Sequence, residues 1–190
     1  MPEKARVLLD TDANNEIDDQ HAIAYLLLNG EAFVVEGLTV NRTNNGGDIE
    51  EQAKEAERVI RLCNLDSQLP VTRGASGSFD DIALCVDDPV YDGKDAVNLI
   101  IERAHATQVD KLILLAIGKL TNIALALKKD PDIIDRVRVV WLGSNYPDPG
   151  EYNLDNDEPS VNFVLDTDVE FEIAVVRYFA ESGTGAVRVT

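Results

Sequence analysis

With 190 residues, of which 45% are hydrophobic and 27% charged, the chain has the length and composition of one globular domain and not of a disordered segment. Its 35 Asp and Glu residues against 17 Lys and Arg residues give a formal net charge of −18 at pH 7. This acidic excess argues against nucleic acid and anionic membranes as partners, because both bind basic surfaces. A cation or a neutral, polyhydroxylated ligand is easier for such a surface to accommodate.

The sequence does not indicate membrane insertion, secretion or disulfide bonding. No stretch approaches the roughly 18 consecutive apolar residues of a membrane-spanning helix. Residues 1–12 lead into a strand and not into a cleavable signal sequence. Cys63 and Cys85 are too few and too far apart for a metal motif or a disulfide framework. We therefore expect a cytoplasmic protein with both thiols free.

The apolar pattern predicts strands and helices in alternation. A strand at 5–9 leads through an acidic loop to a helix that Asp18 or Asp19 caps and that runs to Leu27. A strand at 33–40 precedes the clearest helix, which Asp48 opens and whose apolar residues recur at spacings of 4, 3, 4 and 3. The remaining predicted strands are 70–72, 111–117, 137–142 and 171–176, and the remaining predicted helices are 95–106, 120–127 and 159–165.

This alternation predicts right-handed crossovers and an open, mostly parallel, Rossmann-like sheet with helices on both faces. The sequence contains no evident internal repeat, low-complexity tract or linker, so we interpret residues 1–190 as a single α/β domain. The stretch from Gly74 to Gly93 shows no regular pattern. A structureless run of this length is unusual in a compact domain and suggests a functional loop or lid.

Four carboxylates flank the first predicted loop: Asp10, Asp12, Asp18 and Asp19. Ionised carboxylates held close together raise one another's pKa unless a positive charge lies between them. Open parallel sheets bind ligands at the carboxyl ends of their strands, where this loop lies. The loop could therefore offer oxygen ligands to Ca²⁺ or Mg²⁺ and set a carboxylate beside a water molecule that it deprotonates. The alternative is that Asp18 only caps the helix while the other carboxylates are solvated.

The same loop resembles the N-terminal signature of the inosine-uridine preferring nucleoside hydrolase family, which reads Asp-x-Asp-Pro-Gly-x-Asp-Asp after the first strand. Here Ala13 to Ile17 separate the two acidic pairs, so the turn is two residues longer. Three further segments resemble family motifs in the same order: DAVNLII at 95–101 (family HAVNLII), GKLTNIA at 118–124 (GPLTNIA) and VNFVLD at 161–166 (FNIxxD). On these four ordered matches the chain is identified as a member of the family.

The resemblance implies an open α/β sheet that binds Ca²⁺ and hydrolyses the N-glycosidic bond of ribonucleosides to ribose and free base. It implies that Asp12 is general base and metal ligand, that Asp19 is a further ligand, and that the backbone carbonyl of Ile117 is another. Asp10 would support the cluster from behind. The side chains implied to bind the ribose are Asp18, one of Asn44 and Asn45 (with Asn41 less favoured), Asn153 and Asn162.

The chain also departs from the family pattern. Family chains are longer, so this one resembles their N-terminal majority and lacks the final metal-ligand Asp and the C-terminal part. The usual loop His is missing, and Ser160 stands where the family has a Glu that contacts the sugar. The only two histidines, His21 and His105, are interpreted as structural or solvated. No group that protonates the leaving base can be assigned.

These departures leave alternatives open. The favoured prediction is an active hydrolase. The second is a catalytically impaired homologue or fragment that binds Ca²⁺ or a nucleoside. The third, a haloacid dehalogenase-type phosphatase, is disfavoured because Asn14 stands where that class has Thr or Val. The segment 170–179 is apolar on both faces, so we expect a strand that is partly exposed or covered by another chain, and a homo-oligomer is one way to cover it.

Overall fold

The structure is a computed structural model that describes residues 4–65, 69–106, 110–178 and 180–186. Six strands form one sheet in the order β3-β2-β1-β4-β5-β6, and every neighbouring pair is parallel. The strands are β1 (Ala5–Thr11), β2 (Phe33–Val40), β3 (Val71–Arg73), β4 (Leu112–Ala116), β5 (Val137–Leu142) and β6 (Glu170–Ala174). The expected open, parallel, doubly wound sheet is thus confirmed, and its order reverses between β1 and β4.

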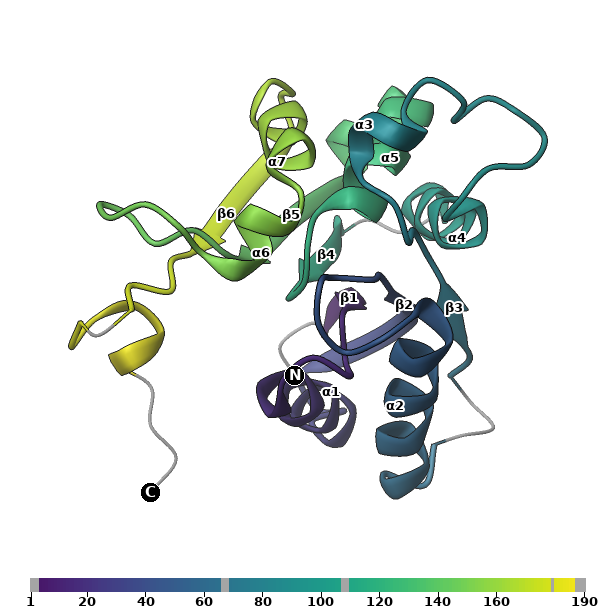
Figure 1. The fold of residues 1–190 in the computed structure, drawn as a ribbon. Helices are drawn as coiled ribbons and strands as arrows, with labels where there is room; N and C mark the ends of the chain where they lie inside the picture. Colours follow the sequence, from purple (N-terminus) through teal and green to yellow (C-terminus); the bar gives the residue numbers. More distant parts are fainter. Residues whose placement is uncertain (1–3, 66–68, 107–109, 179, 187–190) are drawn as a thin grey trace.

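The helices lie on both faces of this sheet (Figure 1). They are α1 (Ile17–Leu28), α2 (Ile49–Leu62), α3 (Phe79–Ile82), α4 (Lys94–His105), α5 (Thr121–Lys129), α6 (Tyr152–Asn156) and α7 (Glu158–Leu165), with 3₁₀ turns η1 (Pro131–Arg136) and η2 (Gly183–Ala186). Among the helices of the described ranges, none combines the length and apolar character that a bilayer crossing requires.

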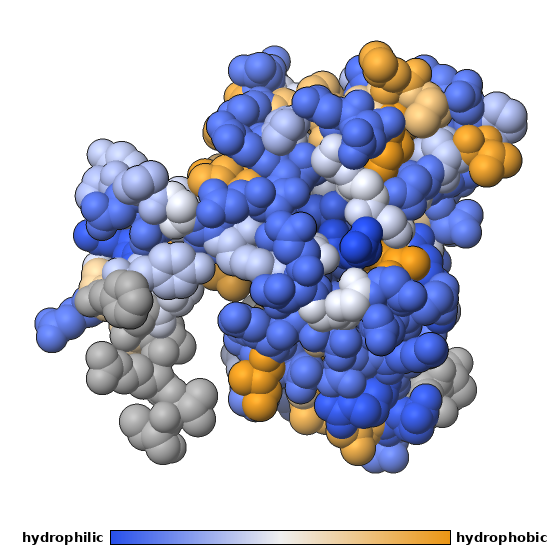
Figure 2. Space-filling view, viewed as in Figure 1, coloured by the Kyte–Doolittle hydropathy of each residue, from blue (hydrophilic) through white to orange (hydrophobic). Residues whose placement is uncertain are grey.

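Two apolar clusters hold the layers together, because successive side chains of a strand point to opposite faces. Val7 and Leu9 of β1 pack with α1 and α2 on one face, whereas Leu8 packs with α4, α5 and α7 on the other. The remaining surface is largely hydrophilic on the face shown in Figure 2, with separate apolar patches, as the net charge of −18 leads one to expect. The central strands are therefore covered on both faces, whereas every second residue of the edge strand β6 is exposed, so the expectation that this strand is partly exposed is confirmed.

Most element boundaries agree with the sequence prediction to within two residues, and the capping of α2 is confirmed. Asp48 accepts hydrogen bonds from the backbone of Glu50 and Glu51, and the side chain of Glu51 bonds back to the amide of Asp48. Two predictions were wrong at the first loop. Strand β1 continues through Asp10 and Thr11, and α1 begins at Ile17 with Glu16 as its N-cap, so neither Asp18 nor Asp19 caps the helix.

The stretch from Gly74 to Gly93 is not structureless. It contains α3, and its side chains Phe79, Ile82, Val86 and Tyr91 are buried in the core. Buried Lys119 donates a hydrogen bond to the carbonyl of Gly77 at 2.6 Å, which ties the segment to the end of β4. The lid interpretation is therefore not supported, since the segment is packed down. At the other end of the sheet β6 ends at Ala174, two residues earlier than predicted, and Phe179 lies outside the described residues.

Candidate functional site

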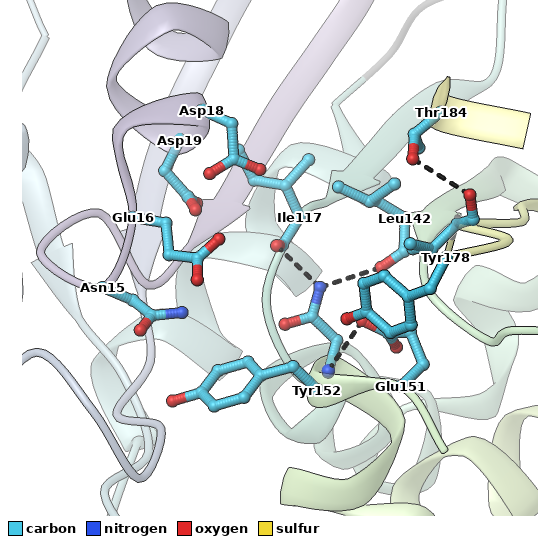
Figure 3. Close-up of a pocket in the computed structure, with 12 residues that line it drawn as sticks. Asn15, Glu16, Asp18, Asp19, Ile117, Leu142, Glu151, Tyr152, Tyr178 and Thr184 are labelled. Carbon is cyan, nitrogen blue, oxygen red and sulfur yellow. Dashed lines mark hydrogen bonds between the residues drawn. The ribbon is translucent and has the colours of Figure 1, made fainter. Parts of the chain in front are cut away.

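The candidate site lies at the carboxyl ends of the central strands, where the sheet order reverses. A cavity of about 290 Å³ opens there. Residues far apart in the sequence face it, among them Asp18, Asp19, Ile117, Glu151, Asn153 and Tyr178 (Figure 3). In Figure 3 the acidic side chains of α1 lie on one side, and Tyr152 and Tyr178 lie on the other. The fold thus brings together Asp19, Ile117 and Asn153, three of the residues that the sequence singled out.

Asp10 lies at the end of β1, fully buried, and its carboxylate accepts hydrogen bonds from the side chains of residues distant in the sequence. Its Oδ1 accepts from Thr39 Oγ1 at 2.5 Å and from Asn122 Nδ2 at 2.8 Å, and its Oδ2 accepts from Asn41 Nδ2 at 2.9 Å. Burial raises the pKa of Asp10 to about 6, and these three hydrogen bonds oppose the rise. Both oxygens are therefore engaged, which fits a supporting role behind the site.

Asp12 is also buried, but only one of its two oxygens is engaged. Oδ2 accepts a hydrogen bond from Thr43 Oγ1 at 2.6 Å, whereas Oδ1 has no hydrogen-bond partner among the described residues. Burial raises the pKa of Asp12 to about 6. A buried carboxylate oxygen without a donor is costly unless a proton donor or a cation meets it. Oδ1 of Asp12 is thus the atom of the site that most needs a ligand.

A second unpartnered oxygen faces the same space. Oδ1 of Asn41 is buried without a hydrogen-bond partner in the described ranges. A Cβ atom placed on Gly118 would lie 2.8 Å from Asp12 Oδ1 and 3.0 Å from Asn41 Oδ1. Asn41 Nδ2 would lie at the same 3.0 Å, so Asp12 Oδ1 and the amide group of Asn41 converge beside the Cα of Gly118, in a space that a larger residue would fill. The indole of Trp141 holds Gly118 in place by donating to its carbonyl at 2.9 Å.

Asp19 lies in the first turn of α1 and accepts a hydrogen bond from the hydroxyl of Thr11. Burial, and after it the charge of Asp12, raises the pKa of Asp19 to about 8. Such a shift means that the ionised form lacks a positive neighbour. Asp18 is exposed at the edge of the cavity. Asp12 and Asp19 therefore remain as the two carboxylates of the loop that could share a cation.

The donor set fits a hard cation only in part. Asp12 and Asp19 supply carboxylate oxygens and Ile117 supplies a carbonyl oxygen, the ligand types that Ca²⁺ prefers. Within the described ranges, no three His, Cys, Asp or Glu side chains are arranged to hold a metal ion. The cage of four carboxylates that the sequence suggested does not form, because Asp10 is used in hydrogen bonds and Asp18 is exposed at the edge of the cavity. What remains is two carboxylates and one carbonyl.

Asn153 forms one wall of the cavity. Its Nδ2 donates to the carbonyls of Ile117 and Leu142, each at 3.0 Å (Figure 3). The carboxylate of Glu151 caps α6 and accepts from the backbone amides of Asn153 and Leu154, both at 3.0 Å. Asn153 is therefore fixed in place. A carbonyl oxygen has two lone pairs, so the Ile117 oxygen keeps one acceptor position for another partner.

The other predicted ribose ligands do not reach this cavity. Asn44 and Asn45 are exposed, and their backbone amides donate to Asn156 Oδ1 at 2.7 Å and to Tyr152 Oη at 2.8 Å. Asn162 is exposed on α7 and is not among the lining residues. Their role as substrate ligands stays a prediction. His21 is exposed as expected, and His105 pairs with Asp130 at the surface.

Sequence reasoning missed the polar residues that hold the acidic loop. Gln52 is completely buried on α2, accepts from the amide of Asn14 at 2.7 Å and donates to the carbonyl of Gly46 at 3.0 Å. Gln52 lies next to Ala53 of the apolar stripe of α2, and this position could have indicated that its side chain is buried. Thr43 and Asn122 gave no such signal, because their partners lie far away in the sequence.

The fold and the geometry define an α/β protein with an acidic ligand site at the reversal point of a parallel sheet. The chain matches the family model described as inosine-uridine preferring nucleoside hydrolase over residues 7–179. It therefore belongs to the inosine-uridine preferring nucleoside hydrolase family.

Individual relatives agree with this assignment. The chain is 38% identical over 80 residues to the inosine-uridine preferring nucleoside hydrolase of Leishmania major, covering 42% of this chain and 24% of the relative. It is 35% identical over 80 residues to the enzyme of the same name from Crithidia fasciculata, covering 39% of this chain and 25% of the relative. The matched segment thus spans about a quarter of the length of these relatives.

Solved structures show the same fold. A plant nucleoside hydrolase superposes with a TM-score of 0.75 at 20% identity, covering 92% of this chain and 60% of that one. The inosine-uridine preferring nucleoside hydrolase of Bacillus anthracis superposes with a TM-score of 0.72 at 20% identity, covering 98% of this chain and 68% of that one.

Proposed function

We propose that this chain acts on ribonucleosides, hydrolysing the N-glycosidic bond to ribose and free base in the presence of Ca²⁺. Family membership supports the reaction class. The observation that carries the assignment to this site is the buried Oδ1 of Asp12, which has no hydrogen-bond partner among the described residues. Asp12 is not itself among the residues that line the cavity; its Oδ1 lies beside Gly118, which follows the cavity-lining Ile117. A reducing compartment such as the cytoplasm suits the two free, half-buried cysteines.

Asp12 is the proposed general base. Burial raises the pKa of Asp12 to about 6 in the metal-free chain, and a bound cation would lower it. Oδ1, which has no hydrogen-bond partner among the described residues, would accept a proton from water. The water oxygen then bonds to C1′ of the ribose, and the electron pair of the C1′–N bond leaves with the base, which takes up a proton. Asp18, at the edge of the cavity, is placed to accept a hydrogen bond from a ribose hydroxyl.

Asp12, Asp19 and the Ile117 carbonyl are the proposed ligands of Ca²⁺. When bound, the ion would supply the positive charge that favours ionised Asp19 and would help to orient the ribose hydroxyls. Asn153 contributes by holding the Ile117 carbonyl in a fixed direction. Positioning of the ribose contributes much of the catalytic effect at such a site, because the attacking water must be aligned with the C1′–N bond that breaks.

Incubating the purified chain with inosine, uridine and a nitrophenyl riboside, each with Ca²⁺ or with a chelator, tests the proposal. We expect release of ribose that depends on Ca²⁺ and falls by about 100-fold or more in Asp12→Asn, the usual range for loss of a general base. Asp168→Asn, an exposed residue outside the cavity lining, is the matched control and should keep full activity. Undiminished activity of Asp12→Asn would refute the role of Asp12.

The second candidate function is binding of Ca²⁺ or a nucleoside without turnover. It is favoured by one observation: Asn44, Asn45 and Asn162 do not line the cavity, so the set of ribose contacts is incomplete. Calorimetry with Ca²⁺ and with inosine separates the two candidates. Heat of binding without release of ribose from any substrate would select the binding function.

A further inference from the structure

We infer that Thr43 is a positioning residue, which fixes the carboxylate of Asp12 so that one chosen oxygen is presented to ligand and water. The inference rests on the proposed function of Asp12. Thr43 Oγ1 lies 2.6 Å from Asp12 Oδ2, and Asp12 Oδ1 is left without a partner among the described residues. The two oxygens of a carboxylate are chemically equivalent, so a donor on one of them decides which oxygen stays available.

The hydroxyl of Thr43 has only one hydrogen, and the geometry shows where it goes. The alternative acceptor, the carbonyl of Asn45, is 3.5 Å away, at the limit of a hydrogen bond. Of the neighbouring amides, Asn41 Nδ2 is committed to Asp10 Oδ2 at 2.9 Å, whereas the side chain of Asn15 lies close enough to Asp12 to lower its pKa. Thr43 is the side chain that donates to Asp12 Oδ2 and leaves Oδ1 without a partner among the described residues.

Hydrogen bonds hold the backbone before and after Thr43, so the position of its hydroxyl group is fixed. The amide of Asn41 donates to the carbonyl of Thr11 at 3.0 Å, and the amide of Arg42 donates to the carbonyl of Ala75 at 3.0 Å. Further along the same loop, Gln52 holds the carbonyl of Gly46. Thr43 itself is 3% exposed. A rigid, buried donor is what a positioning role requires.

The oxygen left free by Thr43 lies beside the Cα of Gly118. Asp12 Oδ1 and Asn41 Oδ1 both face the space above Gly118. Without the Thr43 hydroxyl, Asp12 Oδ2 would lose the hydrogen bond that distinguishes it from Oδ1. The loss should therefore affect ligand binding and turnover more than it affects the fold.

The experiment compares Thr43→Val, which removes the hydroxyl at nearly constant volume, with Thr43→Ser, which keeps it. Partners of metal ligands typically contribute about 10- to 100-fold in metal affinity or activity. We expect a loss of that size in Ca²⁺ affinity by calorimetry and in kcat for the nitrophenyl riboside in Thr43→Val, with KM little changed. Thr43→Ser should recover most of both. Thr167→Val, which removes the hydroxyl that bonds to the carbonyl of Val164 at 2.7 Å on α7, is the matched control and should change neither.

Melting of each metal-free variant shows whether it folds. If Thr43→Val does not fold, Thr43→Ala replaces it, and equal Ca²⁺ affinity of the Ala and Ser variants would overturn the inference. A folded Thr43→Val with the Ca²⁺ affinity and kcat of the unmodified chain would overturn it too, while leaving the proposed function intact. If the unmodified chain binds Ca²⁺ without turnover, affinity alone decides the role of Thr43. If it neither binds Ca²⁺ nor releases ribose, the proposed function fails and the inference fails with it.

Discussion

Asp10 and Asn122 lie 112 residues apart in the sequence, yet the amide of Asn122 donates to the carboxylate of Asp10 at 2.8 Å in the buried centre of the molecule. The other end of the same amide accepts from the backbone of Ala75 at 2.8 Å. One side chain thus joins β1, the start of α5 and the segment after β3. These hydrogen bonds lie directly behind the candidate site.

Replacing Asn122 by Leu should destabilise the protein by about 1–3 kcal/mol, the usual cost of leaving buried polar groups without partners. The change removes a donor from Asp10 and an acceptor from Ala75. Urea unfolding of the metal-free chain measures the loss. Asn98→Leu, on the exposed side of α4, should stay within about 0.5 kcal/mol. Equal stability of the two variants would contradict the bridging role of Asn122.

Asp19→Asn should make the metal-free protein more stable at neutral and mildly alkaline pH. The pKa of Asp19 is about 8 in the folded chain against an ordinary value of 3.8, so the folded state holds a proton that the unfolded state has released. The free energy of unfolding of the unmodified chain therefore falls as pH rises from about 4 to about 8. The Asp19→Asn variant does not show this fall, because Asn has no proton to release in this range.

Melting temperatures in chelator at pH 5, 6, 7 and 8 test this sign. The difference between Asp19→Asn and the unmodified chain should grow with pH, whereas exposed Asp168→Asn should show no such trend. Added Ca²⁺ should stabilise the unmodified chain and leave Asp19→Asn unchanged. A difference that shrinks as pH rises would show that Asp19 is ionised in the folded, metal-free state.

Gly118→Ala should abolish Ca²⁺ binding and turnover. The new Cβ would lie 2.8 Å from Asp12 Oδ1 and 3.0 Å from Asn41 Oδ1, so it fills the space that both oxygens face. We expect a loss of about 1–3 kcal/mol in stability, as for other overpacked sites. Gly30→Ala is the control, because nothing lies within 4 Å of its Cβ position. Wild-type Ca²⁺ affinity in Gly118→Ala would mean that the ligand binds elsewhere.

Gln52→Met should loosen the acidic loop without removing a carboxylate. The change keeps the length of the side chain but loses the hydrogen bonds to Asn14 and Gly46. Amide hydrogen exchange at Asn14 should become faster, and the stability should fall by about 1–3 kcal/mol. Gln20→Met, at a half-buried position of α1, should leave the exchange rate of the Asn14 amide unchanged. Unchanged exchange in Gln52→Met would assign the anchoring of the loop to other residues.

The sequence predicted the fold well because helix and strand periodicities are local signals. The strands 33–40 and 137–142 were predicted with the bounds that the structure has, and so was the helix cap at Asp48. The N-cap of α1 was predicted wrongly. Asp is a common capping residue, so Asp18 and Asp19 were favoured, but Glu16 is the residue with the extended N-cap backbone conformation. The segment 74–93 looked irregular because its buried side chains follow no single period.

The candidate site was predictable in part, for a related reason. Asp12, Asp19 and Ile117 end up at the same edge because strand ends are fixed by the topology. The direction of an exposed side chain is not fixed in that way. Asn44 and Asn45, in the loop after β2, and Asn162, on α7, are not among the residues that line the cavity. Thr43 could not be found from spacing, because its hydrogen bond to Asp12 spans 31 residues.

The hydrogen bond between Asp10 and Asn122 also sets the order of events during synthesis. Asp10 leaves the ribosome 112 residues before its partner, so for most of translation the first carboxylates are hydrated and ionised in an unfinished chain. Because β4 and Asn122 follow β1 in the chain, neither the pairing of β1 with β4 nor the hydrogen bond to Asp10 can form until those residues have been synthesised. The acidic end of the sheet is thus completed late, and a nascent chain that stops short of β4 has the carboxylates of this site but not the buried surroundings that raise their pKa values.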